Sequence, residues 1–269
     1  MKKENPLFSI ITISFNSVKT IEKTILSILN QTYKNIEYIV IDGGSTDGTI
    51  DIIKKYSDKI AYWVSEKDEG ISDAYNKGIL ASHGEIIGIM NSDDWYELNA
   101  LKIIAELDFE NNADFYVGSL RYWDEKGNNI VVFPDRKYTK KISYRMPHLN
   151  HPSSFLKKEV YNTVGLFNKK YRYSLDYDLF LRISLNNKKC VFTNEVLSNM
   201  LVGGVSNIHE MEGHREVLAI SKNKILGTVW YLFVSLKTKI RKIILACGGS
   251  HLLFLIKHAM YHASTEKNN

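Results

Sequence analysis

The sequence is poor in features that would restrict it to a specialised class of protein. It has only two cysteines among 269 residues, Cys190 and Cys247, and no nearby residues give either one metal-ligand spacing. Two cysteines cannot form a disulfide framework, so we expect a reducing, cytosolic compartment. The four prolines do not gather into a linker, and we find no repeat or low-complexity tract. These absences favour an ordinary globular protein.

Long apolar runs are also missing. The longest uncharged stretches near the end of the sequence cover residues 225–236 and 243–256. Both are shorter than the roughly 20 residues that a helix needs to span a bilayer. The first apolar run contains serine and threonine and has no small-residue cleavage site, so it predicts no signal peptide.

An excess of positive charge is missing from most of the sequence and occurs only near its end. The sequence has 35 basic and 30 acidic residues, a formal net charge of +5. Residues 222–269 hold eight lysines and arginines and one acid, whereas residues 1–221 hold 27 basic and 29 acidic residues. This distribution argues against a nucleic-acid binder with a basic core. It predicts a basic appendage on a globular body that is slightly acidic.

Short apolar runs alternate with helical patterns in the first half of the sequence. Runs rich in β-branched residues predict buried parallel strands at 7–13, 36–41, 60–64 and 86–90. Helical spacing of apolar residues predicts helices between them, including one over 72–82. This alternation predicts an α/β fold built from βαβ units. The second half is less regular, with strands expected at 115–117 and 130–133, and helices over 175–185 and after 210.

Polar residues follow three of the predicted strands, at 14–16, 42–45 and 91–94. Ligands bind beyond the carboxyl ends of strands in sheets of this kind. Asp93 and Asp94 can hold a hard cation there, since Mg²⁺ or Mn²⁺ takes one or two carboxylates and leaves room for substrate phosphates. Asp42 can accept a hydrogen bond from a nucleotide base or ribose. Simple turns are the alternative for both segments, because Asp and Asn favour turns.

Four segments, in this order, resemble the motifs of glycosyltransferase family 2. They read TISFN (12–16), SILNQTYKNIEYIVIDGGSTDGT (27–49), DEGISDAYNKG (68–78) and GEIIGIMNSDDWY (84–96). The resemblance covers about residues 7–205. It implies a nucleotide-sugar-dependent enzyme with the GT-A fold, a Rossmann-like and mostly parallel central sheet flanked by helices. A helical extension would follow at the C-terminus.

The resemblance also implies donor-binding residues. Asp42 would contact the base, usually uracil, and the nucleotide-sugar site as a whole would comprise Ile13, Phe15, Asn16, Asp42, Asn76, Lys77 and Asp93. The D-x-D motif of the family matches 91–93 or 92–94, and Asn91 stands where the fuller motif has an acid. We assign Asp93 mainly to the ribose and Asp94 to the metal, with Asp93 as the other candidate ligand. The cofactor would be Mn²⁺ or Mg²⁺.

A fifth segment, YRYSLDYDLFLRI (171–183), resembles the part of the family that supplies the general base. Asp176 matches that base, which would take the proton of the acceptor hydroxyl in a single inverting displacement. A helix cap is the alternative role for Asp176. Four further residues are expected on the acceptor side, each with an ordinary structural role as the alternative: Trp95, His151, Asp178 and Arg182.

The basic residues within 222–269 alternate with apolar and aromatic stretches. This pattern is typical of helices at an anionic membrane surface. Packing on the domain or on a second subunit is the alternative. We therefore expect residues 1–205 to form the catalytic domain, with a nucleotide-sugar half (1–112) and an acceptor half (113–205). Residues 206–269 would form the helical extension. The protein would be cytoplasmic and bind peripherally to the inner face of the cell membrane. A homo-oligomer is compatible with the sequence.

These expectations give one main function and two rivals. The main function is transfer of a hexose or N-acetylhexosamine from a UDP-sugar to a saccharide acceptor, lipid-linked, in polysaccharide or O-antigen assembly. A sugar nucleotidyltransferase is disfavoured, because residues 14–17 lack the Gly-rich, Arg-containing loop such enzymes carry after the first strand. A non-catalytic nucleotide-binding scaffold is disfavoured by the acids at 42, 93, 94 and 176. We expect no nucleic-acid partner.

Overall fold

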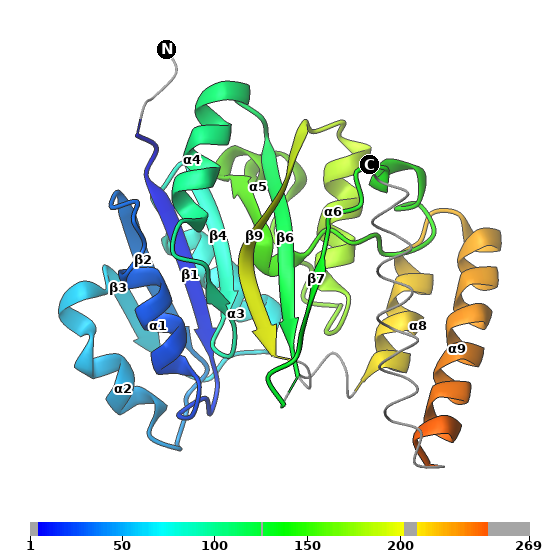
Figure 1. Cartoon of the computed structure of the whole chain (residues 1–269), viewed down its shortest axis with the longest axis horizontal. Helices are drawn as coiled ribbons and strands as arrows, with labels where there is room; N and C mark the ends of the chain where they lie inside the picture. The colour runs from blue at the N-terminus through cyan, green and yellow to red at the C-terminus, as the bar shows by residue number, and fades with distance from the viewer. Residues whose placement is uncertain (1–4, 125, 202–208, 247–269) are drawn as a thin grey trace.

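The structure is a computed structural model that describes residues 5–124, 126–201 and 209–246 (Figure 1). Four strands at one side of the sheet run parallel, in the order β3-β2-β1-β4. Their bounds are β1 Phe8–Ser14, β2 Ile36–Asp42, β3 Tyr62–Ser65 and β4 Ile86–Asn91. The predicted parallel sheet is confirmed, and β1, β2 and β4 carry β-branched residues that are buried on both faces.

The other side of the sheet mixes strand directions and continues the order as β8-β6-β9-β5. β8 is antiparallel to both β4 and β6, whereas β6 and β9 are parallel to one another. β5 and β7 pair antiparallel with β9 and β6, respectively. The bounds of these strands are β5 Trp95–Tyr96, β6 Phe115–Trp123, β7 Asn129–Val132, β8 Ser154–Lys157 and β9 Cys190–Leu201.

Helices cover both faces of the sheet (Figure 1). One apolar core holds residues of α1, α2 and α4, and a second holds residues of α3, α5, α6 and α8. The helices are α1 Ile21–Leu29, α2 Thr49–Lys55, α3 Ile71–Ala81, α4 Ala100–Asn111, α5 Lys158–Val164, α6 Leu175–Leu185, α8 Glu210–Ile220 and α9 Lys224–Ala246. Consecutive residues of β1 serve opposite cores, since Ile10 belongs to the first and Ile11 to the second.

Two packing details place the elements around the site. A Cβ atom on Gly78 would collide with Ile11, so glycine lets α3 pack closely on β1. Val217 and Ile220 of α8 are buried in the second core, so α8 is part of the body of the molecule. α8 belongs to the extension expected from residue 206 onward, and the structure shows it packed into the same core as α3 and α6. No helix in the described part of the chain is long and apolar enough to cross a membrane.

Candidate active site

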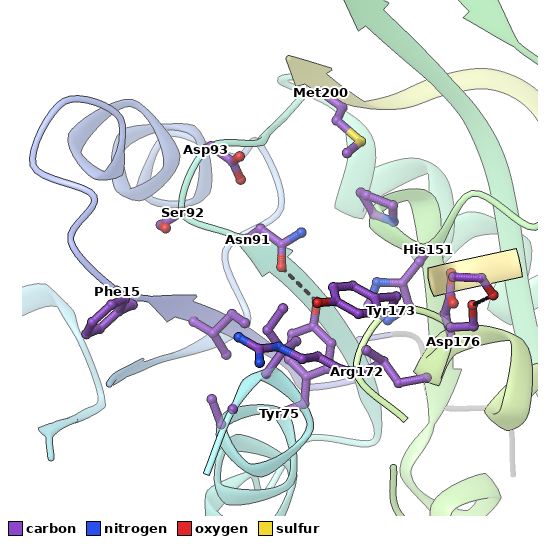
Figure 2. Close-up of a pocket in the computed structure, with 18 of the residues that line it drawn as sticks. Phe15, Tyr75, Asn91, Ser92, Asp93, His151, Arg172, Tyr173, Asp176 and Met200 are labelled. Atoms are coloured by element: carbon purple, nitrogen blue, oxygen red, sulfur yellow. Dashed lines mark hydrogen bonds between the residues drawn. The ribbon is translucent and has the colours of Figure 1, made fainter. Parts of the chain in front are cut away.

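A cavity of about 1430 Å³ lies beyond the carboxyl ends of β1 and β4. Its walls come from segments far apart in the sequence: residues 13–20, 67–71, 91–93, 146–152, 172–177, and α8. Asp93 and Asp176 lie on opposite sides of this cavity, with Asn91, Tyr75 and Arg172 drawn between them (Figure 2). A cavity at the ends of parallel strands is where α/β sheets bind ligands.

An aromatic ring and a carboxylate form one rim of the cavity. The Phe15 side chain is 63% exposed. A Cβ atom on Gly43 would lie 2.6 Å from Asp68 Oδ2 and 3.4 Å from Phe15 Cδ2, so the missing side chain lets these two groups meet at Gly43. Asn16 has a left-handed backbone, and its Oδ1 accepts a hydrogen bond from the Thr46 N–H, which ties the rim to the β2 turn. A planar base can stack on Phe15 while Asp68 accepts its N–H.

Asp42 lies beneath this rim and does not line the cavity. Its carboxylate accepts hydrogen bonds from the hydroxyls of Ser14, Ser45 and Ser65, and from the N–H groups of Gly44 and Ser45. Burial opposes ionisation of Asp42, but the hydrogen bonds of the serines hold its pKa below the ordinary value. In the structure Asp42 therefore organises the β2 turn, and Asp68 is the carboxylate at the rim. Asp68 was missed in the sequence, although it opens the segment DEGISDAYNKG.

The acids after β4 have different surroundings. Asp93 lines the cavity, and burial raises its pKa. Asp94 is fully buried, and both burial and the charge of Asp93 raise its pKa well above the ordinary value. Asn91 accepts a hydrogen bond from the Tyr75 hydroxyl at 2.7 Å and donates from Nδ2 to Asp94 Oδ2 at 3.3 Å. Of the two acids, it is Asp93 that faces the cavity.

The oxygen atoms at this point fit a hard divalent cation. Asp93 offers a carboxylate to the cavity, and within the described ranges Asp94 Oδ1 is buried without a hydrogen-bond partner. Among those same residues, no three Asp, Glu, His or Cys side chains gather into a metal site. The protein would thus supply one or two oxygens, and a bound diphosphate would supply more, as is usual for Mg²⁺.

Asp176 lies in the first turn of α6 and lines the opposite wall. Burial raises the pKa of Asp176 to about 6, although the Tyr177 N–H donates a hydrogen bond to its Oδ1 at 2.8 Å. At neutral pH the carboxylate is mostly ionised, yet it binds a proton more readily than a solvated aspartate. A base that titrates near the working pH is suited to proton transfer.

Glu216 of α8 holds the backbone that leads to Asp176. Its carboxylate accepts hydrogen bonds from the N–H groups of Arg172, Tyr173 and Ser174 at 3.0, 2.9 and 2.8 Å. The Ser174 hydroxyl also donates to the Gly213 carbonyl. The three N–H groups on one carboxylate fix the segment without engaging the Arg172 side chain, which remains exposed at the cavity. No sequence signal links Glu216 to this segment, because the contact spans more than 40 residues.

Besides Asp42, two more of the predicted donor residues lie outside the cavity lining. The Asn76 amide donates to the Phe167 carbonyl and accepts from the Phe167 N–H, both at 2.9 Å. Lys77 forms ion pairs with Glu66 at 2.7 Å and Asp73 at 3.4 Å. Both side chains therefore have structural partners here, and the cations at the cavity are Lys19, Lys67 and Arg172. Ile13, Phe15 and Asn16, which were also predicted for the donor, line the cavity.

Of the predicted acceptor residues, only His151 lines the cavity. Its ring packs against Tyr75 and Phe167, and burial lowers its pKa to about 4, so the ring is neutral at pH 7. Trp95 packs against Trp123 and carries the Lys23 ammonium over its ring, away from the cavity.

The other two acceptor candidates form a structural ion pair. Arg182 Nε and Nη2 both donate to Asp178 Oδ2 at 2.9 Å. The same guanidinium donates to the carbonyls of residues 164–166, where α5 ends. Asp178 and Arg182 thus join α6 to the end of α5.

Similar proteins share both the sequence pattern and the fold. The family model for glycosyl transferase family 2 matches residues 9–165. An uncharacterised glycosyltransferase of Rickettsia typhi is 31% identical over 262 residues, which is 92% of this chain and 77% of the relative.

Two solved structures have the same architecture. One is S. aureus TarS (residues 1–349) in complex with UDP-GlcNAc, with a TM-score of 0.61 at 19% identity over 80% of this chain. The chain spans 66% of that structure. The other is the mannosyltransferase PcManGT from Pyrobaculum calidifontis with GDP-Man and Mn²⁺, with a TM-score of 0.63 at 16% identity over 96% of this chain and 81% of that one. The chain therefore belongs to glycosyltransferase family 2 and has the GT-A fold.

Proposed function

We propose that the chain transfers a hexose or N-acetylhexosamine from a UDP-sugar to a saccharide acceptor, with inversion at the anomeric carbon. The observation that carries the proposal is the placement of Asp93 and Asp176 on opposite sides of one cavity. The UDP-GlcNAc of TarS and the GDP-Man of PcManGT support a nucleoside diphosphate sugar as the donor. The proposed acceptor is a lipid-linked saccharide in polysaccharide or O-antigen assembly at the inner face of the cell membrane.

The donor would lie between the Phe15 rim and Asp93. Phe15 stacks on the base, and Asp68 accepts a base N–H, which favours uracil because its ring carries an N–H between two carbonyls. Lys19, Lys67 and Arg172 supply positive charge for the diphosphate. Asp93 would hold a divalent cation, Mn²⁺ or Mg²⁺, which offsets charge on the departing diphosphate when bound.

The acceptor would enter from the α6 and α8 side, next to Asp176. The Asp176 carboxylate takes the proton of an acceptor hydroxyl as that oxygen forms a bond to the anomeric carbon. The bond from this carbon to the diphosphate oxygen breaks, and its electron pair leaves with the nucleoside diphosphate. One displacement from the opposite face inverts the anomeric centre. Glu216 keeps the 172–174 backbone in place, so Asp176 stays in register with the acceptor.

A donor screen with matched variants tests this function. UDP-, GDP- and dTDP-sugars are supplied with Mn²⁺ or Mg²⁺ and short lipid-diphosphate saccharides, and nucleoside diphosphate release is measured. We expect release from a UDP-sugar, and a loss of about 10²-fold or more in kcat for Asp176→Asn and Asp93→Asn. Asp51→Asn, at an exposed position on α2, is the control. Full activity of both site variants would refute the mechanism. Release of pyrophosphate from a sugar phosphate and a nucleoside triphosphate would instead identify a nucleotidyltransferase.

A further inference from the structure

The outer face of α9 is apolar along almost its whole length. The helix has 23 residues, and eight of its large apolar side chains are exposed by between 45% and 79%: Ile225, Leu226, Val229, Leu232, Phe233, Leu236, Ile240 and Ile243. At about 100° per residue these eight fall within about 120° of the helix circumference, in a stripe about 27 Å long. We call them the α9 stripe.

The opposite face of α9 attaches the helix to the molecule. Gly227, Val234 and Thr238 are buried on that face. The Arg145 guanidinium lies 4.6 Å from the centre of the Trp230 ring. The N–H groups of Lys222 and Asn223, just before α9, donate to the Ser143 carbonyl. The α9 stripe is therefore held outward by a helix whose inner face is already packed.

The charged residues at the borders of the α9 stripe indicate which kind of surface the stripe binds. Lys237 and Lys239 are exposed, and the helical repeat puts them at opposite borders of the stripe. Residues 222–246 contain no Asp or Glu. A second copy of the chain, paired through this face about a two-fold axis, would bring lysine borders together with no acid on α9 to offset them. An anionic bilayer accepts an apolar stripe and attracts lysines at both borders.

We propose that the α9 stripe docks in the plane of an anionic membrane surface. This inference rests on the proposed function, because a lipid-linked acceptor would be found at the membrane surface on which the α9 stripe docks. α9 runs beside α8 (Figure 1), and Glu210, Gly213 and Val217 of α8 line the cavity. Docking through α9 thus puts the α8 wall of the cavity next to the surface that carries the acceptor.

Vesicle sedimentation of the full chain tests the docking surface. Vesicles are made of phosphatidylcholine alone or with phosphatidylglycerol. We expect binding that needs phosphatidylglycerol and weakens with salt, and an about tenfold or greater loss for Leu236→Glu. Leu185→Glu is the matched control, because Leu185 is 56% exposed and Leu236 is 59% exposed. The double variant Lys237→Glu, Lys239→Glu should lose the preference for phosphatidylglycerol.

Three results would overturn the proposal. Equal sedimentation of Leu236→Glu and Leu185→Glu would mean that the stripe does not dock. A dimer in solution that Leu236→Glu dissociates would mean that a second copy covers the stripe. Loss of binding on deletion of residues 247–269, with no effect of Leu236→Glu, would assign the contact to that segment. Nucleoside diphosphate release without vesicles is measured in parallel, so a failure of docking and a failure of the proposed function are told apart.

Discussion

At the scale of single residues, the ionisation of Asp176 should control the rate. Burial raises its pKa to about 6, and only the carboxylate form can accept the proton of the acceptor. We expect kcat at saturating donor to fall about tenfold per pH unit below pH 6 and to level off above it. A rate profile from pH 5 to 8, with nucleotide binding measured over the same range, checks this. A flat profile would exclude Asp176 as the base.

Asn91 lowers the negative charge at the end of the cavity where we propose that a metal binds. Asn91→Asp would replace the hydrogen bond to Asp94 by repulsion between two carboxylates, since Asn91 Nδ2 lies 3.3 Å from Asp94 Oδ2. We expect a stability loss of about 1–3 kcal/mol without metal. Added Mn²⁺ should restore more stability to this variant than to the wild type.

Thermal unfolding with and without Mn²⁺ measures the effect of Asn91→Asp. Tyr75→Phe is the control, because it removes the hydrogen bond to Asn91 and adds no charge. Its response to Mn²⁺ should match that of the wild type. An equal response of Asn91→Asp would mean that the metal binds away from this residue.

The single residues differ in how far the sequence could predict their role. Phe15 and Asp93 follow strands with strong local patterns, and both reach the cavity. Asn76 belongs to an equally recognisable segment, but its partner was not predictable. Asn76 bonds to Phe167, 91 residues away, and only the folded chain brings the two together.

At the scale of elements, α8 links the C-terminal helices to the segment that carries the proposed base, Asp176. Glu216→Ala would release three backbone N–H groups at 172–174. We expect kcat to fall about tenfold or more while UDP binding changes much less, because Phe15, Asp68 and Asp93 lie on other elements and only Arg172 of the proposed donor contacts lies on this segment. Glu216→Gln should recover part of the rate, since its amide oxygen still accepts.

Glu212→Ala is the control for Glu216, because Glu212 is exposed on the same helix. Steady-state kinetics and calorimetry with UDP separate the two effects. Equal losses of UDP binding and of kcat in Glu216→Ala would indicate general unfolding, and the positioning role would then be wrong.

The elements were predictable where the pattern was local. β1, β2 and β4 are apolar runs, and the structure has them within about a residue of the predicted ranges. β3 is shifted to Tyr62–Ser65, and β6 extends to Trp123, beyond the predicted 115–117. The two-residue β5 has too few residues to show a period, and its pairing with β9 depends on tertiary structure.

At the scale of the whole molecule, donor binding should stabilise the fold. A ligand at 100 times its dissociation constant adds about 2.7 kcal/mol of stability. We expect UDP with Mn²⁺ to raise the unfolding temperature, and Asp93→Asn to remove the part of the shift that depends on Mn²⁺. Thermal unfolding with UDP, Mn²⁺ or both measures each part. A shift in Asp93→Asn equal to that of the wild type would show that the metal is held elsewhere.

The hydrogen bonds from residues 172–174 to Glu216 also have a consequence for which parts of the chain can be substituted during evolution. Except for Arg172, the residues proposed for the donor precede residue 94, whereas the backbone beside the proposed base is held by a helix that starts at residue 210. Substitutions in α8 can therefore alter the acceptor side while the nucleotide side keeps its residues. The proposed donor and acceptor sides are thus built largely from different parts of the chain, so a substitution on one side can leave most of the other side unchanged.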